Sequence, residues 1–151
     1  MEFIQLHDGL DCDCIESAKQ NCSDLFARKV DDTVSSIKYQ AFKASATNRK
    51  AVEEDCYKSC SRRAISIDIW TEETLPFLEE KHRKAIELAQ QFRNKLVIFK
   101  IRENGGYVKH TPVLEPENPY HHDLYLPDSF KDNPGACLEF ITHKILLQDA
   151  V

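Results

Sequence analysis

The feature that most constrains this chain is an uninterrupted stretch, residues 10–75, that contains no glycine or proline. Glycine and proline are the strongest local breaks in regular structure, so their absence permits long helices. Within the stretch, apolar and small side chains recur at alternating spacings of three and four, which places them on one helix face. One such stripe is Ile15, Ala18, Cys22 and Leu25. A longer one is Val30, Val34, Ile37, Ala41 and Ala44, followed by Ala51 or Val52 and then by Cys56 and Cys60. We therefore predict a first helix from Asp11 and a second, about 45 Å long, over residues 30–60.

Beyond the second predicted helix the hydrophobic pattern changes. Isoleucine occupies every second position of residues 65–70, which is the period of a strand. Thr71 or Thr74 then caps a helix whose apolar stripe extends over residues 75–92. The apolar run 96–101 follows and reads as a buried strand. Strand, helix and strand with short connections predict a βαβ unit.

Residues that favour turns are frequent in the rest of the chain. Glu-Asn-Gly-Gly at 103–106 predicts a hairpin turn, with a returning strand over 107–113. Residues 114–134 hold four of the six prolines and predict a long irregular loop, a kind of segment that often carries function. An apolar helix is expected from residue 135 to residue 148.

These elements predict an α+β or α/β fold in a single domain spanning residues 1–151. Residues 1–63 would form its helical part, with the long helix packed beside a small sheet. Residues 64–151 would form its α/β part, in which a mixed sheet of three or four strands contains one βαβ unit and one hairpin. A chain of 151 residues is long enough to bury a hydrophobic core of its own.

Charge and hydropathy narrow the classes of function. The formal net charge is −5, which disfavours unspecific attraction to nucleic acid and favours a basic partner. No apolar stretch approaches the length of a membrane span, and the first residues lack the pattern of a secretory signal. We therefore expect a soluble cytoplasmic protein with reduced thiols.

Five of the six cysteines lie in the first sixty residues. Cys56 and Cys60 are four apart, so on a helix they project from the same face, and Cys12 and Cys14 could complete a tetrahedral zinc site. Disulfides between the first two predicted helices are a second interpretation. A third is that these cysteines are small hydrophobic residues in a helix interface.

A second concentration of reactive side chains lies around the predicted loop. His121, His122, Asp123 and His143 are candidate ligands of a divalent metal. In order, His122, Asn133 and His143 resemble the HNH nuclease arrangement. That resemblance implies His122 as general base, Asn133 bracing the loop and His143 binding the metal, with His121 as a further ligand. The alternative is a polar surface loop that contains paired histidines by chance.

No glycine-rich phosphate loop and no Gly-x-Ser-x-Gly motif occurs in the chain. We therefore predict a non-enzymatic protein of the accessory, inhibitor or immunity type, which docks onto a basic protein partner. The alternatives are a metal-dependent hydrolase or nuclease that uses the histidine-rich loop, and a protein stabilised by zinc. No cofactor is expected under the first interpretation, and zinc or another divalent metal under the others.

Overall fold

The computed structural model describes residues 3, 6, 12–30, 56–89, 95–114, 117–130, 132 and 134–145. Within these ranges the chain forms six strands and two α-helices. In chain order they are β1 (Leu25–Val30), α1 (Cys56–Arg63), β2 (Ile65–Trp70), α2 (Leu75–Ala89), β3 (Lys95–Ile101), β4 (Tyr107–His110), β5 (His121–Tyr125) and β6 (Leu138–Ile145). Two short 3₁₀ turns, at Asp128–Phe130 and Pro134–Cys137, precede β6.

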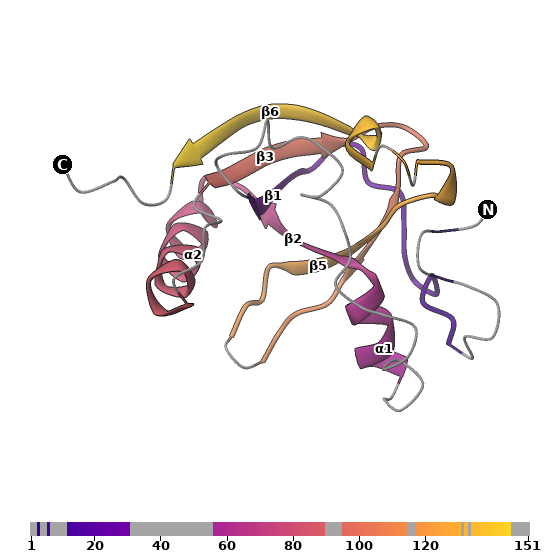
Figure 1. Cartoon of the computed structure of the whole chain (residues 1–151), viewed down its shortest axis with the longest axis horizontal. Helices are drawn as coiled ribbons and strands as arrows, with labels where there is room; N and C mark the ends of the chain where they lie inside the picture. The colour runs from indigo at the N-terminus through magenta and orange to yellow at the C-terminus, as the bar shows by residue number, and fades with distance from the viewer. Residues whose placement is uncertain are drawn as a thin grey trace.

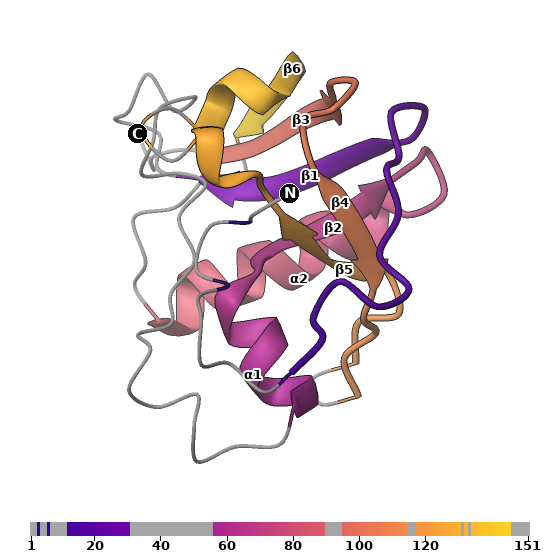
Figure 2. The same cartoon turned by 90° about the vertical axis from the view of Figure 1, so that its right-hand side faces the viewer.

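The six strands form one sheet in the order β4-β5-β2-β1-β3-β6, and every neighbouring pair is antiparallel. Both helices lie on the same side of this sheet (Figure 1). Figure 2 shows β1 between β3 and β2, with the segment that precedes β1 passing along β4. That segment joins the sheet edge at Lys19, whose backbone exchanges two hydrogen bonds with Val108.

The core lies on both faces of the sheet. One face is filled by apolar side chains from all six strands, among them Phe26, Ile67, Phe99 and Leu124, all at most 1% exposed. Full burial of a side chain of this size stabilises the fold by about 1.5–3 kcal/mol. On the helix side, one cluster contains Ala27, Leu78, Leu96 and Ile98, and a second contains Phe3, Cys14, Cys60, Ala64 and Tyr125.

The central part of the chain follows its sequence pattern closely. Strand β2, helix α2 and strand β3 occupy the predicted segments, which confirms those three elements. Thr71 and Thr74 cap α2 reciprocally, each hydroxyl accepting from the other's backbone N–H at 3.1 and 2.9 Å. Leu78, one turn into the helix, is completely buried against the sheet.

The predicted fold class is wrong, because the molecule is mostly an antiparallel sheet. Residues 12–24 are irregular, residues 25–30 form a central strand, and α1 is described over Cys56–Arg63. The side chain of Asn21 accepts from the backbone N–H groups of Ser23 and Asp24, a turn that interrupts the helical spacing before β1. The rest of the predicted long helix, residues 31–55, lies outside the described residues.

The predicted hairpin is wrong, and the predicted βαβ unit is present only in split form, because a third strand separates its two parallel strands. Strands β2 and β3 run the same way but β1 lies between them, and β4 pairs with β5 instead of β3. Gly105, in the turn at residues 103–106, lets its backbone lie close to that of Cys137. A Cβ on Gly105 would lie 2.5 Å from the carbonyl oxygen of Cys137. That carbonyl accepts from the backbone N–H of Arg102 at 2.8 Å.

The predicted C-terminal helix is strand β6. Leu138 is buried and Phe140 packs against the same cluster, whereas Glu139 and Ile141 are exposed, so the pattern has the period of a strand. Its pairing with β3 has an irregularity at Ile141, which lies between the partners of Phe99 and Ile98. Neither helix of the described part is long and apolar enough to cross a membrane.

Candidate functional site

Strand β5 divides the histidine-rich segment between the two faces of the sheet. Residues 121–125 were predicted to lie in an irregular loop, but they pair with β2 and β4. Alternate side chains of a strand point to opposite faces, so His122 lies on one face and His121 and Asp123 on the other. The described residues contain no group of three His, Cys, Asp or Glu side chains arranged to hold a metal ion.

The other residues of the HNH resemblance are not brought to His122. His143 lies in β6, where it is in register with Val97 of β3. Three strands, β2, β1 and β3, separate β5 from β6. At about 4.8 Å per strand, the two histidines are about 19 Å apart along the sheet. Asn133 lies outside the described residues.

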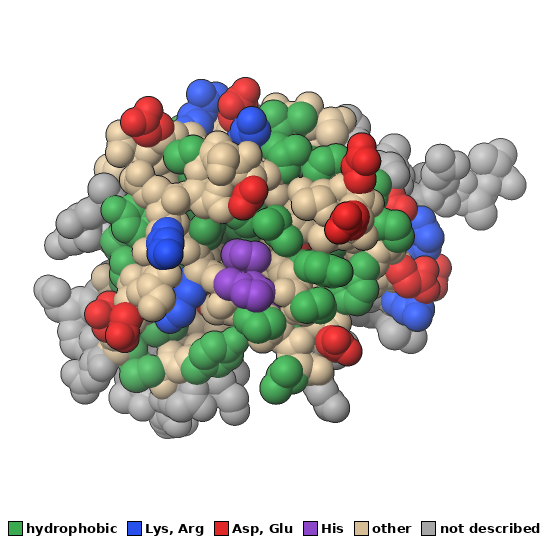
Figure 3. All heavy atoms as spheres, turned by 180° about the vertical axis from the view of Figure 1, so that it is seen from behind, with side chains coloured by type: hydrophobic (Ala, Val, Ile, Leu, Met, Phe, Trp, Pro, Cys, Tyr) green, Lys and Arg blue, Asp and Glu red, His purple; other side chains and the backbone are tan. Residues whose placement is uncertain are grey.

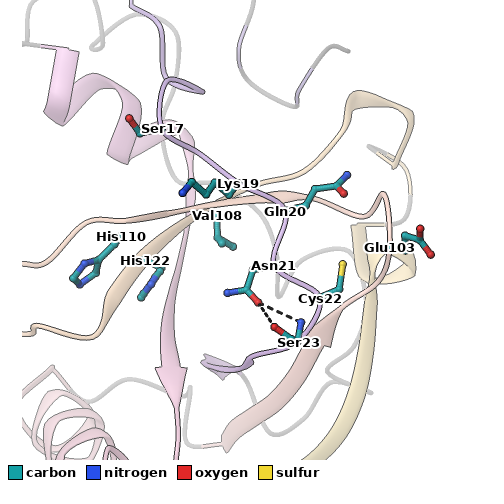
Figure 4. A pocket seen from close by; sticks show the side chains of 10 residues that line it. All are labelled: Ser17, Lys19, Gln20, Asn21, Cys22, Ser23, Glu103, Val108, His110 and His122. Atoms are coloured by element: carbon teal, nitrogen blue, oxygen red, sulfur yellow. Dashed lines mark hydrogen bonds between the residues drawn. The ribbon is translucent and has the colours of Figure 1, made fainter.

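His122 instead pairs with His110 at the wall of a surface cleft. Histidine side chains lie together at the centre of one face of the molecule (Figure 3). The rings of His110 and His122 are stacked, with their centroids 4.8 Å apart. They stand at one end of a cleft of about 850 Å³, with Cys22 and Glu103 toward the other end and Asn21 between (Figure 4).

Backbone carbonyl groups fix the tautomers of both rings. Nε2 of His110 lies 2.7 Å from the carbonyl oxygen of Pro119, and Nδ1 of His122 lies 2.8 Å from that of Tyr120. A carbonyl oxygen only accepts, so each of these nitrogens carries a proton. Burial lowers the pKa of His122, with the neighbouring His110 acting in the same direction, so that the ring stays neutral to a more acidic pH.

The four cysteines considered as zinc ligands form two disulfides, Cys12–Cys56 and Cys14–Cys60. The Cα atoms are 5.4 Å apart in the first pair and 5.2 Å in the second. Of the three interpretations of these cysteines, the structure therefore shows disulfides, although they join α1 to an irregular segment and not to a second helix. A disulfide sulfur lacks the thiolate charge that zinc binds.

The two disulfides differ in their exposure to solvent. Cys14 and Cys60 are 2% and 7% exposed and belong to the apolar cluster around Tyr125. Cys56 is exposed and Cys12 is half-buried. We call Cys12–Cys56 the outer disulfide and Cys14–Cys60 the inner disulfide. Cys56 is the first described residue of α1.

A cavity of about 330 Å³ brings the outer disulfide together with Asp123. Its walls contain Cys12, Cys56 and Cys60 from the disulfides, and Asp123 and Tyr125 from β5. The remaining lining residues are Asp13, Glu16, Tyr57, Lys109 and Thr111. The cysteine pairs and the histidine-rich segment are far apart in the sequence, yet each contributes to this one cavity. We call it the disulfide cavity.

Asp123 is 1% exposed and is held by hydroxyl groups. Its Oδ1 atom lies 3.1 Å from Oγ of Ser61 on α1, and the side chains of Thr111 and Tyr125 also form hydrogen bonds with the carboxyl group. Burial raises the pKa of Asp123 above its usual value, although His121 and the hydroxyl groups act in the opposite direction. The carboxyl group therefore keeps its proton to a higher pH than an exposed aspartate would.

Sequence reasoning missed Lys109 and Tyr125, which line this cavity, and Ser61, which holds Asp123 from α1. Burial, followed by the nearby carboxylate of Asp123, raises the pKa of Tyr125, and its hydroxyl group donates to the carbonyl of Cys60 at 3.3 Å. The signal that could have identified Tyr125 was strand alternation, which places it on the same face as Asp123. Ser61 becomes relevant only once α1 is known to pack against β5.

The chain matches no family model, no curated protein and no solved structure, so the site is interpreted from its own geometry.

Proposed function

We propose that this protein exchanges its outer disulfide with thiols, and that its substrate is a cysteine in a basic protein or peptide. One observation carries the proposal: an accessible disulfide and a buried carboxyl group with a raised pKa line the same cavity. Thiol–disulfide exchange needs an accessible sulfur to attack and a way to accommodate the thiolate that leaves. The disulfide cavity offers both.

The arrangement of the two disulfides allows the outer one to open without loss of the fold. Their sequence separations are 44 and 46 residues, so they close nearly the same loop. While the inner disulfide is intact, that long loop remains closed, and the outer bond adds only a small ring. Most of the entropic stabilisation therefore stays in place when the outer bond is reduced.

Exposure determines the direction of attack. A substrate thiolate attacks the exposed sulfur of Cys56, forms a mixed disulfide with it, and displaces the sulfur of Cys12 as a thiolate. The proton of the Asp123 carboxyl group passes to that thiolate, which leaves a carboxylate and a Cys12 thiol. A second substrate thiolate then attacks the substrate sulfur of the mixed disulfide, and Cys56 leaves as a thiolate. Two thiols are thus oxidised to a disulfide while the outer disulfide is reduced to a dithiol.

Charge at the rim favours a basic substrate. Asp13 and Glu16 are exposed carboxylates that line the disulfide cavity, against the single ammonium group of Lys109. The whole chain carries a net charge of −5, so basic partners are attracted over a longer range as well. Docking to a basic partner, which the sequence predicts, is here the binding step that precedes exchange.

A redox role would be consistent with two disulfides even in the cytoplasm, which is the location that we predict from the sequence. Stable structural disulfides are typical of oxidising compartments, whereas those of cytosolic proteins are usually transient, catalytic or redox-sensing. In either compartment the outer disulfide would be the one that reacts.

The test compares two cysteine-containing peptides that differ only in the sign of their flanking charges. We expect the wild-type protein to oxidise the basic peptide faster than the acidic one, with a difference that shrinks at high salt. Cys12→Ser with Cys56→Ser should abolish the reaction, and Cys22→Ser, which removes an exposed free thiol, should not change it. Unchanged turnover in the double variant would overturn the proposal.

A further inference from the structure

We propose that reduction of both disulfides converts the four cysteines into a zinc site. The inference shares one premise with the proposed function, that the outer disulfide is reducible, and it does not require exchange with a basic substrate. It adds that a stronger external dithiol, which is itself oxidised to a disulfide, also reduces the inner bond. The chemical class of the ligand is a borderline-soft divalent cation that prefers tetrahedral thiolate coordination, of which zinc is the typical case.

The backbone already holds the four cysteines at the spacing that such a site needs. Cys56 and Cys60 are one turn apart on α1, which separates them by about 6 Å along the helix axis. Cys12 and Cys14 are two residues apart, so their Cα atoms are at most about 7 Å from each other. Each disulfide joins one cysteine of the first pair to one of the second, at Cα separations of 5.4 and 5.2 Å. The two disulfides therefore link the same two short segments, and the four sulfur atoms would surround one metal ion if the two cysteine pairs approached each other after reduction.

Within each former disulfide, the two sulfur atoms need to move apart only slightly when metal–sulfur bonds replace the sulfur–sulfur bond. Disulfide sulfurs are about 2.05 Å apart, whereas two sulfurs bound to one tetrahedral zinc at about 2.3 Å are about 3.8 Å apart. The difference of less than about 2 Å is within the reach of side-chain rotation. The disulfide cavity, which contains Cys12, Cys56 and Cys60 in its wall, provides room for it.

A positively charged group close to the proposed site can offset part of its negative charge. Four thiolates and one zinc ion carry a net charge of −2, which is costly to bury without compensation. Lys109 lines the cavity and supplies this positive charge.

Zinc would take over the structural task of the disulfides in the reduced protein. Both disulfides join α1 to residues 12–14, and Cys14 and Cys60 pack with Tyr125 and Ala64 in one apolar cluster. A tetrahedral metal would hold the same elements together when the covalent links are open. Exchange with two external disulfides, which are reduced to four thiols, would form the protein's two disulfides again and release the ion.

The test measures metal binding by the fully reduced chain in the absence of any substrate. The protein is reduced with a phosphine, the reductant is removed without oxygen, and Co²⁺ is added as a spectroscopic probe before displacement by Zn²⁺. We expect one metal per chain, intense absorption bands typical of tetrahedral cobalt–thiolate coordination, and no binding by the oxidised protein. The double variant Cys22→Ser with Cys137→Ser retains the four proposed ligands and should bind equally.

Substitution of Cys14 or Cys56 by serine should weaken binding at least tenfold, because each removes one thiolate ligand. Circular dichroism of each reduced variant shows whether its secondary structure is retained. Absence of a stoichiometric metal in the reduced wild-type chain would overturn the inference, and so would unchanged binding by both serine variants. Exchange with the basic peptide is measured separately with a chelator present, so failure of one proposal is distinguishable from failure of the other.

Discussion

The imidazole of His82 and the carboxylate of Asp68 join α2 to the sheet, with Nε2 of His82 3.1 Å from Oδ2 of Asp68. Both residues are buried, and the second carboxylate oxygen accepts from the side-chain amide of Asn118 at 2.7 Å. Burial acts to raise the pKa of Asp68, but the hydrogen bonds and charge of its neighbours, His82 first, outweigh it and lower the pKa below 3.8. The carboxylate is therefore satisfied on both oxygens in the folded state.

Replacing His82 with leucine should destabilise the protein at neutral pH. The substitution leaves one oxygen of a buried carboxylate without its donor, and a hydrogen bond to a charged group contributes about 1.5–3 kcal/mol. We expect a loss of that size in the free energy of unfolding, measured by urea denaturation at pH 7. Because the folded pKa of Asp68 is lowered, the stabilisation is present above its unfolded pKa and is lost as the pH falls through the folded value. The difference between wild type and variant should shrink accordingly.

Glu80→Ala on the same helix is the matched control. Glu80 forms an exposed pair with Lys84 at 3.3 Å, and such pairs contribute little to stability. We expect this variant to unfold within about 0.5 kcal/mol of wild type. A loss as large as that of the histidine variant would show that the Asp68–His82 contact has no special role.

The two free cysteines, Cys22 and Cys137, should differ in their reactivity toward thiol reagents. Cys22 is exposed, whereas Cys137 is 1% exposed and burial raises the pKa of its thiol to about 12. Only the thiolate reacts with disulfide reagents such as Ellman's reagent. We expect one reactive thiol per native chain, two after unfolding without reductant, and six after unfolding with reductant. Six reactive thiols in the unreduced, unfolded chain would contradict both disulfides.

Local sequence patterns were sufficient to predict three of the elements. Strand β2, helix α2 and strand β3 were predictable because period and capping agreed there, as with Thr74 before the helix. Strand β1 was missed because Phe26 and Ala27 are both buried, so its apolar residues do not alternate. Its formation depends on pairing with β2 and β3, which local spacing does not encode.

The sequence was sufficient to identify the reactive residues of the candidate site, but not to predict which of them lie together. Cysteines 12, 14, 56 and 60 and the residues His121, His122 and Asp123 all stood out as reactive side chains. Which of them meet depends on strand alternation in β5 and on where α1 packs, and neither follows from sequence spacing. Reading residues 114–134 as one loop grouped His121 with His122, which point to opposite faces of the sheet.

Removing the disulfides should reveal their unequal contributions to stability. A loop of about 45 residues contributes about 4 kcal/mol in the chain-entropy model, and the small ring closed by the second bond about 2 kcal/mol. Cys12→Ser with Cys56→Ser should therefore cost about 2 kcal/mol, and the four-serine variant about 6 kcal/mol, in denaturant unfolding. If loss of the outer disulfide alone cost as much as loss of both, the inner bond would not be holding the loop.

Asp123→Asn should slow exchange without loss of the fold. Asparagine keeps the size and hydrogen bonding of the side chain but does not donate the acidic proton, so we expect a rate about ten- to a hundredfold lower. The ratio of wild-type to variant rates cancels the pH dependence of the attacking thiol. This ratio should be largest below the raised pKa of Asp123 and approach one above it. Asp13→Asn, in the wall of the same cavity but exposed, should leave the rate with an uncharged thiol unchanged.

The same substitution should change the pH dependence of stability. A folded pKa that is raised above the unfolded value means that the folded protein binds the proton more tightly. Wild-type stability should therefore fall as the pH rises from the unfolded pKa of Asp123 through its folded pKa, whereas the asparagine variant should lack this decline. Parallel stability profiles, measured by denaturant unfolding across that range, would show that Asp123 is not perturbed.

The most direct test of the central claim is to locate which disulfide opens first. The native protein is equilibrated with dithiol buffers of increasing reducing strength, quenched with an alkylating reagent, and mapped by mass spectrometry. We expect Cys12 and Cys56 to be labelled while Cys14 and Cys60 remain joined and the chain remains folded. If all four cysteines became labelled together as the chain unfolds, or if the inner pair opened first, the outer disulfide would be structural and the proposed exchange would be wrong.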